Sequence, residues 1–132
     1  MLGKEIMWLR KGVKLLEEEV GGGPAIERQH WYVLAIRISL SRGDVVRHPE
    51  KCLGHQMDEN RKIQEDGYFL HRVRIDRENL VGGIFYAVLG MRVGGFRKVT
   101  IAPHLAYREK GIPDLIPPNA KLTAEIKVLE AK

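Results

Sequence analysis

The last part of the chain, residues 102–131, constrains the fold more than any other segment. Its final stretch places an apolar residue at every second position: Leu122, Ala124, Ile126 and Val128. Polar residues fill the positions between them, and this period of two is typical of a β-strand with one buried face. Upstream, Pro103 cannot donate a ladder hydrogen bond, so it ends the strand predicted over residues 96–101.

The loop between these two strands contains residues that free or restrict the backbone. Gly111 lets the chain turn back on itself, because glycine adopts conformations that are closed to other residues. Pro113, Pro117 and Pro118 hold the loop extended, because a proline restricts the residue before it to extended conformations. The sequence therefore predicts a loop with a restricted course that leads directly into the final strand.

Two runs, GMRVGGFRKVTIAPHLAY at 90–107 and GIPDLIPPNAKL at 111–122, resemble the C-terminal half of FKBP-type peptidyl-prolyl cis-trans isomerases. The matching residues include Val93, Gly94, Lys98, Thr100, Pro103, Ala106, Tyr107, Gly111, Pro113, Ile116, Pro117, Pro118 and Leu122. The resemblance implies an α+β fold in which an FKBP-like, half-open antiparallel β-sheet wraps around one short α-helix. It also implies a single domain over residues 1–132, with a loop inserted at about 48–67.

Local patterns predict the remaining elements. Besides 96–101, strands are predicted over residues 13–18, 31–40, 68–75 and 121–129, in a sheet of about five or six strands. A helix is predicted over residues 80–89, capped by Asn79 and ended by Gly90. Gly82 and Gly83 indicate close packing of this helix on the sheet rather than a phosphate loop, since no lysine–serine pair follows them.

Composition limits the class of protein. The 132 residues suit one hydrophobic core, and 44% apolar with 30% charged residues is ordinary for a soluble globular domain. The N-terminus lacks the apolar core of a signal peptide, and the mostly apolar run at 80–90 is too short to span a bilayer. The single cysteine, Cys52, excludes a disulfide framework within the chain. We therefore expect a cytoplasmic monomer with no membrane partner.

Three side chains in the polar segment before the strand at 68–75 have a spacing that could place them around zinc: His48, Cys52 and His55. Glu50 or His71 could supply a fourth ligand. No paired Cys-x-x-Cys or His-x-x-x-His fixes the geometry, so a surface loop that happens to contain these residues is the favoured interpretation. We expect neither a metal nor a cofactor.

Basic residues outnumber acidic ones by 22 to 17, which gives a net charge of +5. Part of this excess is clustered: Arg72, Arg74 and Arg77, then Arg97 and Lys98, then Arg108 and Lys110. Arg72 and Arg74 alternate with apolar residues, so both should lie on the outer face of one strand. A solvated sheet face is favoured over a nucleic-acid patch, because no aromatic residues alternate with the arginines.

The resemblance also implies where a proline-containing substrate would bind. Tyr107 is the candidate catalytic residue, in the tyrosine position of the Ala-Tyr turn. The candidate substrate-binding residues are Ile36, Val46, Leu80, Val81, Ile84, Ile112, Leu115 and Ile116. Several positions depart from the family pattern: Ile36 replaces a tyrosine, Ala124 a phenylalanine, and Val46-Arg47 a phenylalanine–aspartate pair. Ordinary core burial is an equally simple explanation for Tyr107, and the favoured one for Ile36, Val81 and Ile84.

Two functions from different classes remain open. The first is an isomerase that acts weakly on Xaa-Pro bonds, which needs neither a nucleophile nor a metal. The second is a non-catalytic module that keeps the fold and holds a protein or peptide partner. In both cases the expected partner is a proline-containing peptide or protein segment, and the aliphatic replacements argue against efficient catalysis.

Overall fold

A computed structural model of the chain describes residues 7–40, 43–46, 67–77, 80–106, 111 and 116–131. The strands are β1 (Met7–Arg10), β2 (Val13–Glu19), β3 (Trp31–Leu40), β4 (Phe69–Arg74), β5 (Phe96–Ile101) and β6 (Leu122–Ala131). One α-helix, α1 (Gly82–Val88), and one short 3₁₀ helix, η2 (Pro103–Leu105), complete this part of the chain.

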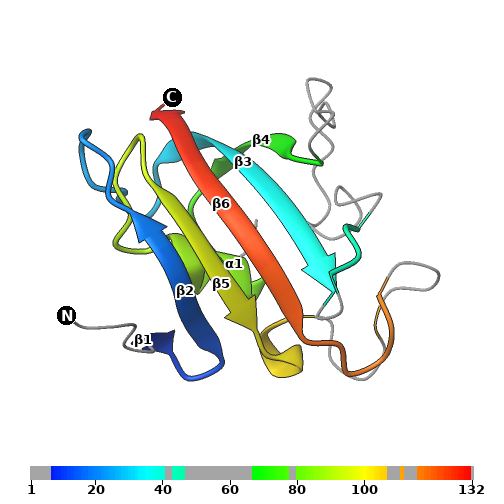
Figure 1. The fold of residues 1–132 in the computed structure, drawn as a ribbon. Coiled ribbons are helices and arrows are strands. Elements are labelled where there is room, and N and C mark those ends of the chain that lie inside the picture. The colour runs from blue at the N-terminus through cyan, green and yellow to red at the C-terminus, as the bar shows by residue number, and fades with distance from the viewer. Residues whose placement is uncertain are drawn as a thin grey trace.

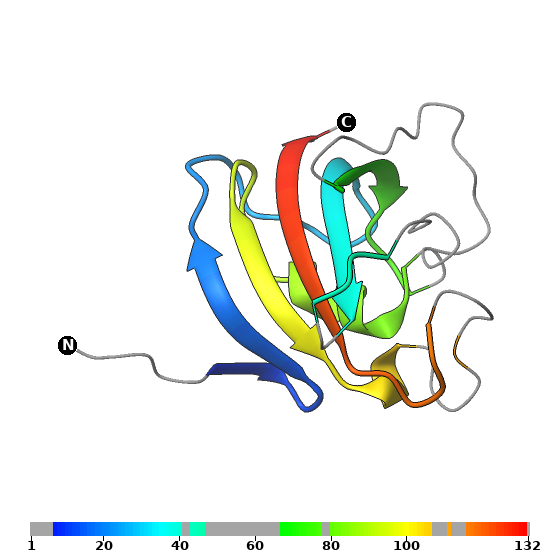
Figure 2. The same ribbon diagram turned by 45° about the vertical axis from the view of Figure 1, so that its right-hand side comes forward.

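The six strands form one sheet in the order β1-β2-β5-β6-β3-β4, and every neighbouring pair is antiparallel. The C-terminal strand β6 lies near the centre of the sheet, between β5 and β3, and α1 lies on one side of the sheet (Figures 1 and 2). The predicted half-open antiparallel sheet with one short helix is confirmed. No helix in the described ranges is long and apolar enough to cross a membrane.

The alternation in β6 has the predicted structural meaning. Its even-numbered residues from Leu122 to Val128 are buried against the helix side, which we call the inner face. On the opposite, outer face, Thr123, Glu125 and Lys127 are partly exposed. Ala124 pairs with Ile38 of β3 and with Val99 of β5, so β6 contributes to the core on both sides. The period of two therefore sets the register of the central strands.

The helix approaches the sheet closely because of one of its two glycines. A Cβ added at Gly83 would lie 2.2 Å from Ile101 Cγ2, closer than any real side chain is found. At Gly82 it would lie 3.3 Å from Leu105 Cδ2. The predicted close packing on the sheet is confirmed for Gly83, whereas the near neighbours of Gly82 are Leu105 and Arg77, outside the strands. Gly90, with φ of 87°, follows the helix in the left-handed conformation that ends many helices, as predicted.

Two predictions about the helix and the basic residues are wrong. The N-cap of α1 is Val81, with no side-chain cap, so the helix begins after the predicted Asn79 cap. Arg97, predicted with Lys98 on a solvated face, is only 7% exposed, because neighbouring residues on a strand point to opposite faces. Its guanidinium donates to the carbonyls of Ala87 and Leu89 at the end of α1.

The two ends of the predicted insertion lie next to each other. Val46 N–H donates to the Ile38 carbonyl (2.8 Å), which holds residues 45–46 beside β3. Gly67, with φ of 84°, lies so close that an added Cβ would be 3.1 Å from Val45 Cγ1. The chain therefore leaves and rejoins the sheet at one place.

Candidate functional site

The described substrate-binding candidates belong to one hydrophobic cluster at the inner face. Five of them are buried in the core: Ile36, Val46, Leu80, Ile84 and Ile116, each 5% exposed or less. Val81 is half-buried and packs against the same cluster. The fold therefore brings together residues from β3, the segment after it, the start of α1 and the segment before β6. Among these candidates, Val81 presents the most surface to a ligand.

The turn into α1 fixes the backbone of Leu80 and Val81. Leu80 N–H donates to the Asp76 carbonyl (3.2 Å), and the Val81 carbonyl accepts from Phe85 N–H (3.0 Å). The first N–H groups of a helix have no partner within it. As the N-cap of α1, Val81 stands at the position for which the resemblance implies a backbone hydrogen bond to a bound peptide.

Two arginines before the helix support this turn, a role that the sequence did not predict for either of them. Arg74 Nε donates to the carboxylate of Asp76 (2.6 Å). The Asp76 side chain is only 7% exposed. Arg77 Nη1 donates to the Leu80 carbonyl (3.0 Å). The available signal was Asp76 itself, a carboxylate directly after the strand predicted at 68–75.

The segment that leads to the Ala-Tyr turn lies against the start of α1. Ala106 N–H donates to the Pro103 carbonyl (3.0 Å), which closes η2, and Leu105 contacts Gly82 at the first helical residue. Ala102 N–H donates to the Gly12 carbonyl (2.8 Å), so the same segment is tied to the hairpin of β1 and β2. These contacts fix the chain as far as Ala106.

Gly111 has the role predicted for it. Its φ of 59° lies in the left-handed region, and an added Cβ would lie 2.2 Å from the Ile116 carbonyl oxygen and 2.8 Å from Pro117 C. Only glycine permits this approach, so Gly111 lies directly against the backbone of Ile116 and Pro117. Ile116 is thereby held in the core at 3% exposure.

Three site candidates, Tyr107, Ile112 and Leu115, lie outside the described residues, as does Arg47. Of the metal-ligand candidates, His48, Glu50, Cys52 and His55 also lie outside them. His71 is buried on the inner face of β4, with its ring 5.8 Å from that of Phe69. Within the described ranges, no group of three or more His, Cys, Asp or Glu side chains could hold a metal ion.

Comparison with known proteins agrees with this fold and arrangement. The family model described as FKBP-type peptidyl-prolyl cis-trans isomerase matches residues 42–129. FK506-binding protein 4 of Aspergillus fumigatus is 32% identical over 122 residues, which are 92% of this chain and 22% of that protein. FK506-binding protein 4 of Aspergillus oryzae gives the same identity and coverage. The chain thus spans about a fifth of the length of these relatives.

Solved structures share the fold over nearly the whole chain. The N-terminal domain of FKBP42 from Arabidopsis thaliana has a TM-score of 0.73 at 19% identity, covering 100% of this chain and 95% of that one. A peptidyl-prolyl cis-trans isomerase from Pseudomonas syringae has a TM-score of 0.70 at 20% identity, covering 96% and 80%. Together with the family match, these similarities show that the chain belongs to the family of FKBP-type peptidyl-prolyl cis-trans isomerases.

Proposed function

We propose that this chain is an FKBP-type isomerase of low activity on Xaa-Pro bonds, and that substrate binds at the start of α1. We call this site the proline slot: Ile36, Val46, Leu80, Val81, Ile84, Ile112, Leu115 and Ile116, with Tyr107 as the polar group. Family membership supports the reaction class. The position of Val81, half-buried at the end of a braced turn, supports the location.

The reaction needs positioning and an apolar surrounding rather than a reactive group. Rotation about a prolyl imide has a barrier of roughly 18–20 kcal/mol and takes tens to hundreds of seconds without a catalyst. The twisted transition state has lost amide resonance and is less dipolar than the planar ground state. An apolar slot therefore favours the twisted form, while the Val81 N–H and the Tyr107 hydroxyl would hold the peptide carbonyls.

The observation that carries the proposal of low activity is the aliphatic lining. Ile36 and Ala124 occupy positions that are aromatic in the family pattern, and both are completely buried at 0% exposure. Small aliphatic side chains in the core leave less rigid apolar surface for a prolyl ring. If the lost stabilisation of the transition state is about 2–4 kcal/mol, the rate falls by roughly thirtyfold to a thousandfold, because each 1.36 kcal/mol is tenfold.

The same observation favours a second candidate function, a peptide-binding module without catalysis. Ground-state binding needs only a complementary surface and a donor such as the Val81 N–H. Catalysis needs contacts that strengthen in the twisted state. A site without aromatic walls loses the contacts that stabilise the twisted state before it loses those that bind the ground state. Such a site would bind a peptide without catalysing its isomerisation.

Exchange spectroscopy on a Leu-Pro peptide separates the two functions. We expect the exchange between cis and trans signals to rise slightly but linearly with protein concentration. Tyr107→Phe should lower this added rate severalfold, whereas the matched control Tyr86→Phe, on α1, should leave it unchanged. Binding shifts without any added exchange would favour the binding module. Efficient turnover, or turnover indifferent to Tyr107→Phe, would overturn the proposal.

A further inference from the structure

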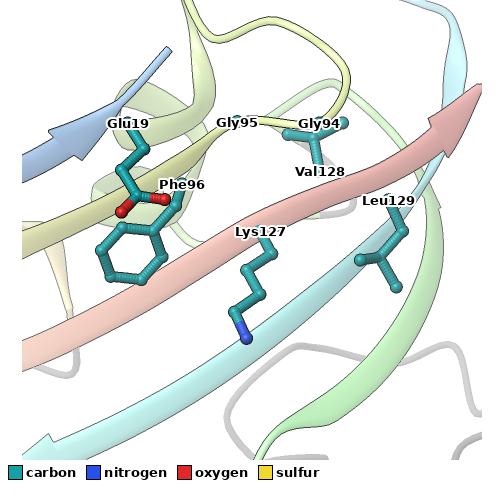
Figure 3. Close-up of a pocket in the computed structure, with 7 residues that line it drawn as sticks. All are labelled: Glu19, Gly94, Gly95, Phe96, Lys127, Val128 and Leu129. Atoms are coloured by element: carbon teal, nitrogen blue, oxygen red, sulfur yellow. The ribbon is translucent and has the colours of Figure 1, made fainter. Parts of the chain in front are cut away.

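The outer face of the sheet carries a hollow on the side opposite α1. Its volume is about 380 Å³. Its lining comes from three strands and one turn: Glu19, Gly94, Gly95, Phe96, Lys127, Val128 and Leu129 (Figure 3). None of these residues belongs to the proline slot. We call this feature the outer hollow.

The turn between α1 and β5 forms the back of the outer hollow, and it is fixed by close backbone contacts. Gly94 N–H donates to the Val128 carbonyl (2.8 Å), and Val128 N–H donates to the Gly95 carbonyl (3.1 Å). A Cβ on Gly95 would lie 2.9 Å from the Arg92 carbonyl oxygen. Gly94 and Gly95 therefore present only backbone to the hollow.

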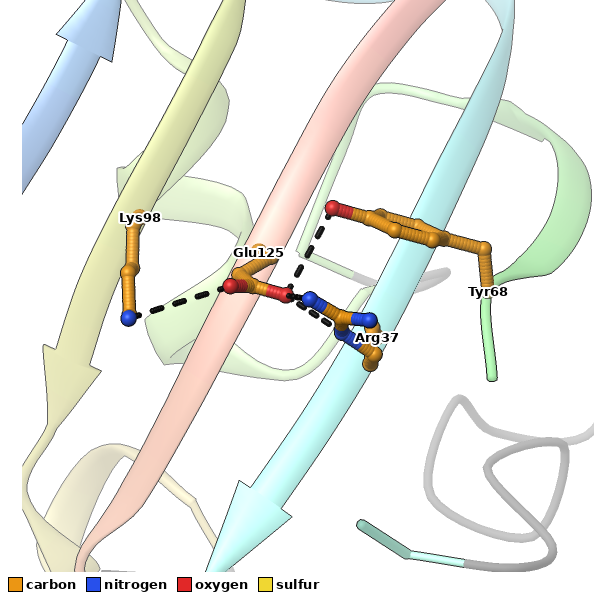
Figure 4. Close-up of polar contacts among 4 residues, drawn as sticks. All are labelled: Arg37, Tyr68, Lys98 and Glu125. Carbon is orange, nitrogen blue, oxygen red and sulfur yellow. Dashed lines mark hydrogen bonds and ion pairs between the residues drawn. The ribbon is translucent and has the colours of Figure 1, made fainter. Parts of the chain in front are cut away.

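The charged group of Lys127 is directed away from the outer hollow. Its Nζ lies 4.2 Å from the centre of the Tyr68 ring, a cation–π contact. Tyr68 in turn donates to Glu125 (3.5 Å), which also accepts from Arg37 (Figure 4). Lys127 therefore offers the hollow its methylene stem. The surface of the hollow is largely apolar, because it consists of this stem, the half-buried Phe96 and Leu129, which is 45% exposed.

The rim of the outer hollow carries a negative charge. The Glu19 carboxylate lies beside the Phe96 ring in Figure 3, and the residue is exposed. In the described part of the chain, Glu19 forms no ion pair, unlike its neighbour Glu18, which accepts from Arg97 (2.6 Å). Glu17, on the same strand, is also exposed. The apolar surface is thus flanked by an acidic strand end that a basic group would complement.

We propose that the outer hollow binds an extended protein segment through one large apolar side chain next to a basic residue. The volume is at the lower end of the range for ligand sites, about 300–1,000 Å³, and suits one side chain. Glu19 supplies charge complementarity to the basic neighbour. No proline is required, so this site is independent of the proline slot.

Titration of the isotope-labelled chain with two blocked, proline-free tetrapeptides tests this proposal by NMR. One contains Phe-Arg and the other Phe-Glu between two alanines. We expect the Phe-Arg peptide to shift the amide signals of Gly94, Gly95, Phe96 and Leu129, and to bind about two- to fivefold more tightly than the Phe-Glu peptide. The amides of Leu80 and Val81 should stay in place.

Two substitutions at exposed positions complete the test, and neither removes a side chain from the core. Glu19→Lys should reverse the preference and favour the Phe-Glu peptide. Leu129→Asp should weaken Phe-Arg binding roughly fivefold or more, because it replaces an apolar wall with a charge. Leu16→Asp is the matched control, since Leu16 is also 45% exposed and lies outside the hollow. Shifts confined to other surfaces, equal affinity for both peptides, or indifference to both variants would overturn the proposal.

Discussion

The two faces of the sheet use arginine in opposite ways. On the inner face, Arg97 has a side chain that is 8% exposed, and it joins Glu18 to two carbonyls at the end of α1. On the outer face, Arg37 is 29% exposed and pairs with Glu125 within a row of polar side chains. The comparison shows that the buried guanidinium of Arg97 connects elements of the fold, whereas the partly exposed Arg37 pairs along the surface of the sheet.

The outer row extends across three strands and the segment before β4. Glu125 on β6 accepts from Arg37 on β3 and from Tyr68, and its other oxygen lies 3.8 Å from Lys98 Nζ on β5 (Figure 4). Solvent screens these charges more than it screens Arg97. We therefore expect substitutions on the inner face to affect stability, and substitutions on the outer face to affect recognition.

The largest effect should come from Arg97→Met. It leaves two helix carbonyls without a donor and Glu18 without its cation, so we expect the free energy of unfolding to fall by about 3 kcal/mol. The matched change on the other face, Arg37→Met, should cost about 1 kcal/mol or less. Urea denaturation of both variants measures the difference. Equal losses of unfolding free energy in Arg97→Met and Arg37→Met would show that the burial of Arg97 adds no stability.

Gly83→Ala should have the next largest effect, because the added methyl group meets Ile101 on the inner face. Overpacking of this kind costs about 1–3 kcal/mol. Gly22→Ala is the control, since an added Cβ there has no atom within 4 Å. Thermal unfolding should show a lower melting temperature for Gly83→Ala alone. A melting temperature unchanged in Gly83→Ala would mean that α1 can move away from β5 at no cost.

Glu125→Gln should have the smallest effect of the three. The side chain keeps its shape but loses the charge that Arg37 and Lys98 share, so we expect a loss of about 0.5–1.5 kcal/mol. Glu17→Gln, at an exposed position on β2, should change stability by less than about 0.5 kcal/mol. The loss for Glu125→Gln should shrink in high salt, which screens partly exposed pairs. A loss independent of salt would contradict an electrostatic origin.

The sequence predicted the parts of the fold that repeat a simple pattern. The period of two in β6 fixed its inner face, and the two glycines of α1 predicted close packing. Strand β1 was not predicted as a separate strand, because four residues are too few to show a period. The burial of Arg97 could not be predicted either, since the carbonyls that it satisfies come from α1, about ten residues away in sequence and fixed only by the tertiary structure.

The candidate site was predicted less completely. Resemblance identified Leu80, Val81 and Ile84, but not the braces that hold their turn, Arg77 and the pair of Arg74 with Asp76. These contacts depend on which side chains meet after the strand ends, and no periodicity encodes that. The outer hollow was also missed, because it depends on an absence of side chains at Gly94 and Gly95 together with the direction of Lys127.

The most direct test of the central claim is a map of amide shifts with a proline-containing peptide. The claim is that proline recognition belongs to the inner side of the fold, at the start of α1, and not to the outer face. Titration of the labelled chain with a blocked Leu-Pro peptide should shift the amides of Leu80, Val81, Ile84 and Ile116, and leave those of Gly94 and Gly95 unmoved. Shifts centred on Gly94, Gly95 and Phe96, with no change at Val81, would contradict the account.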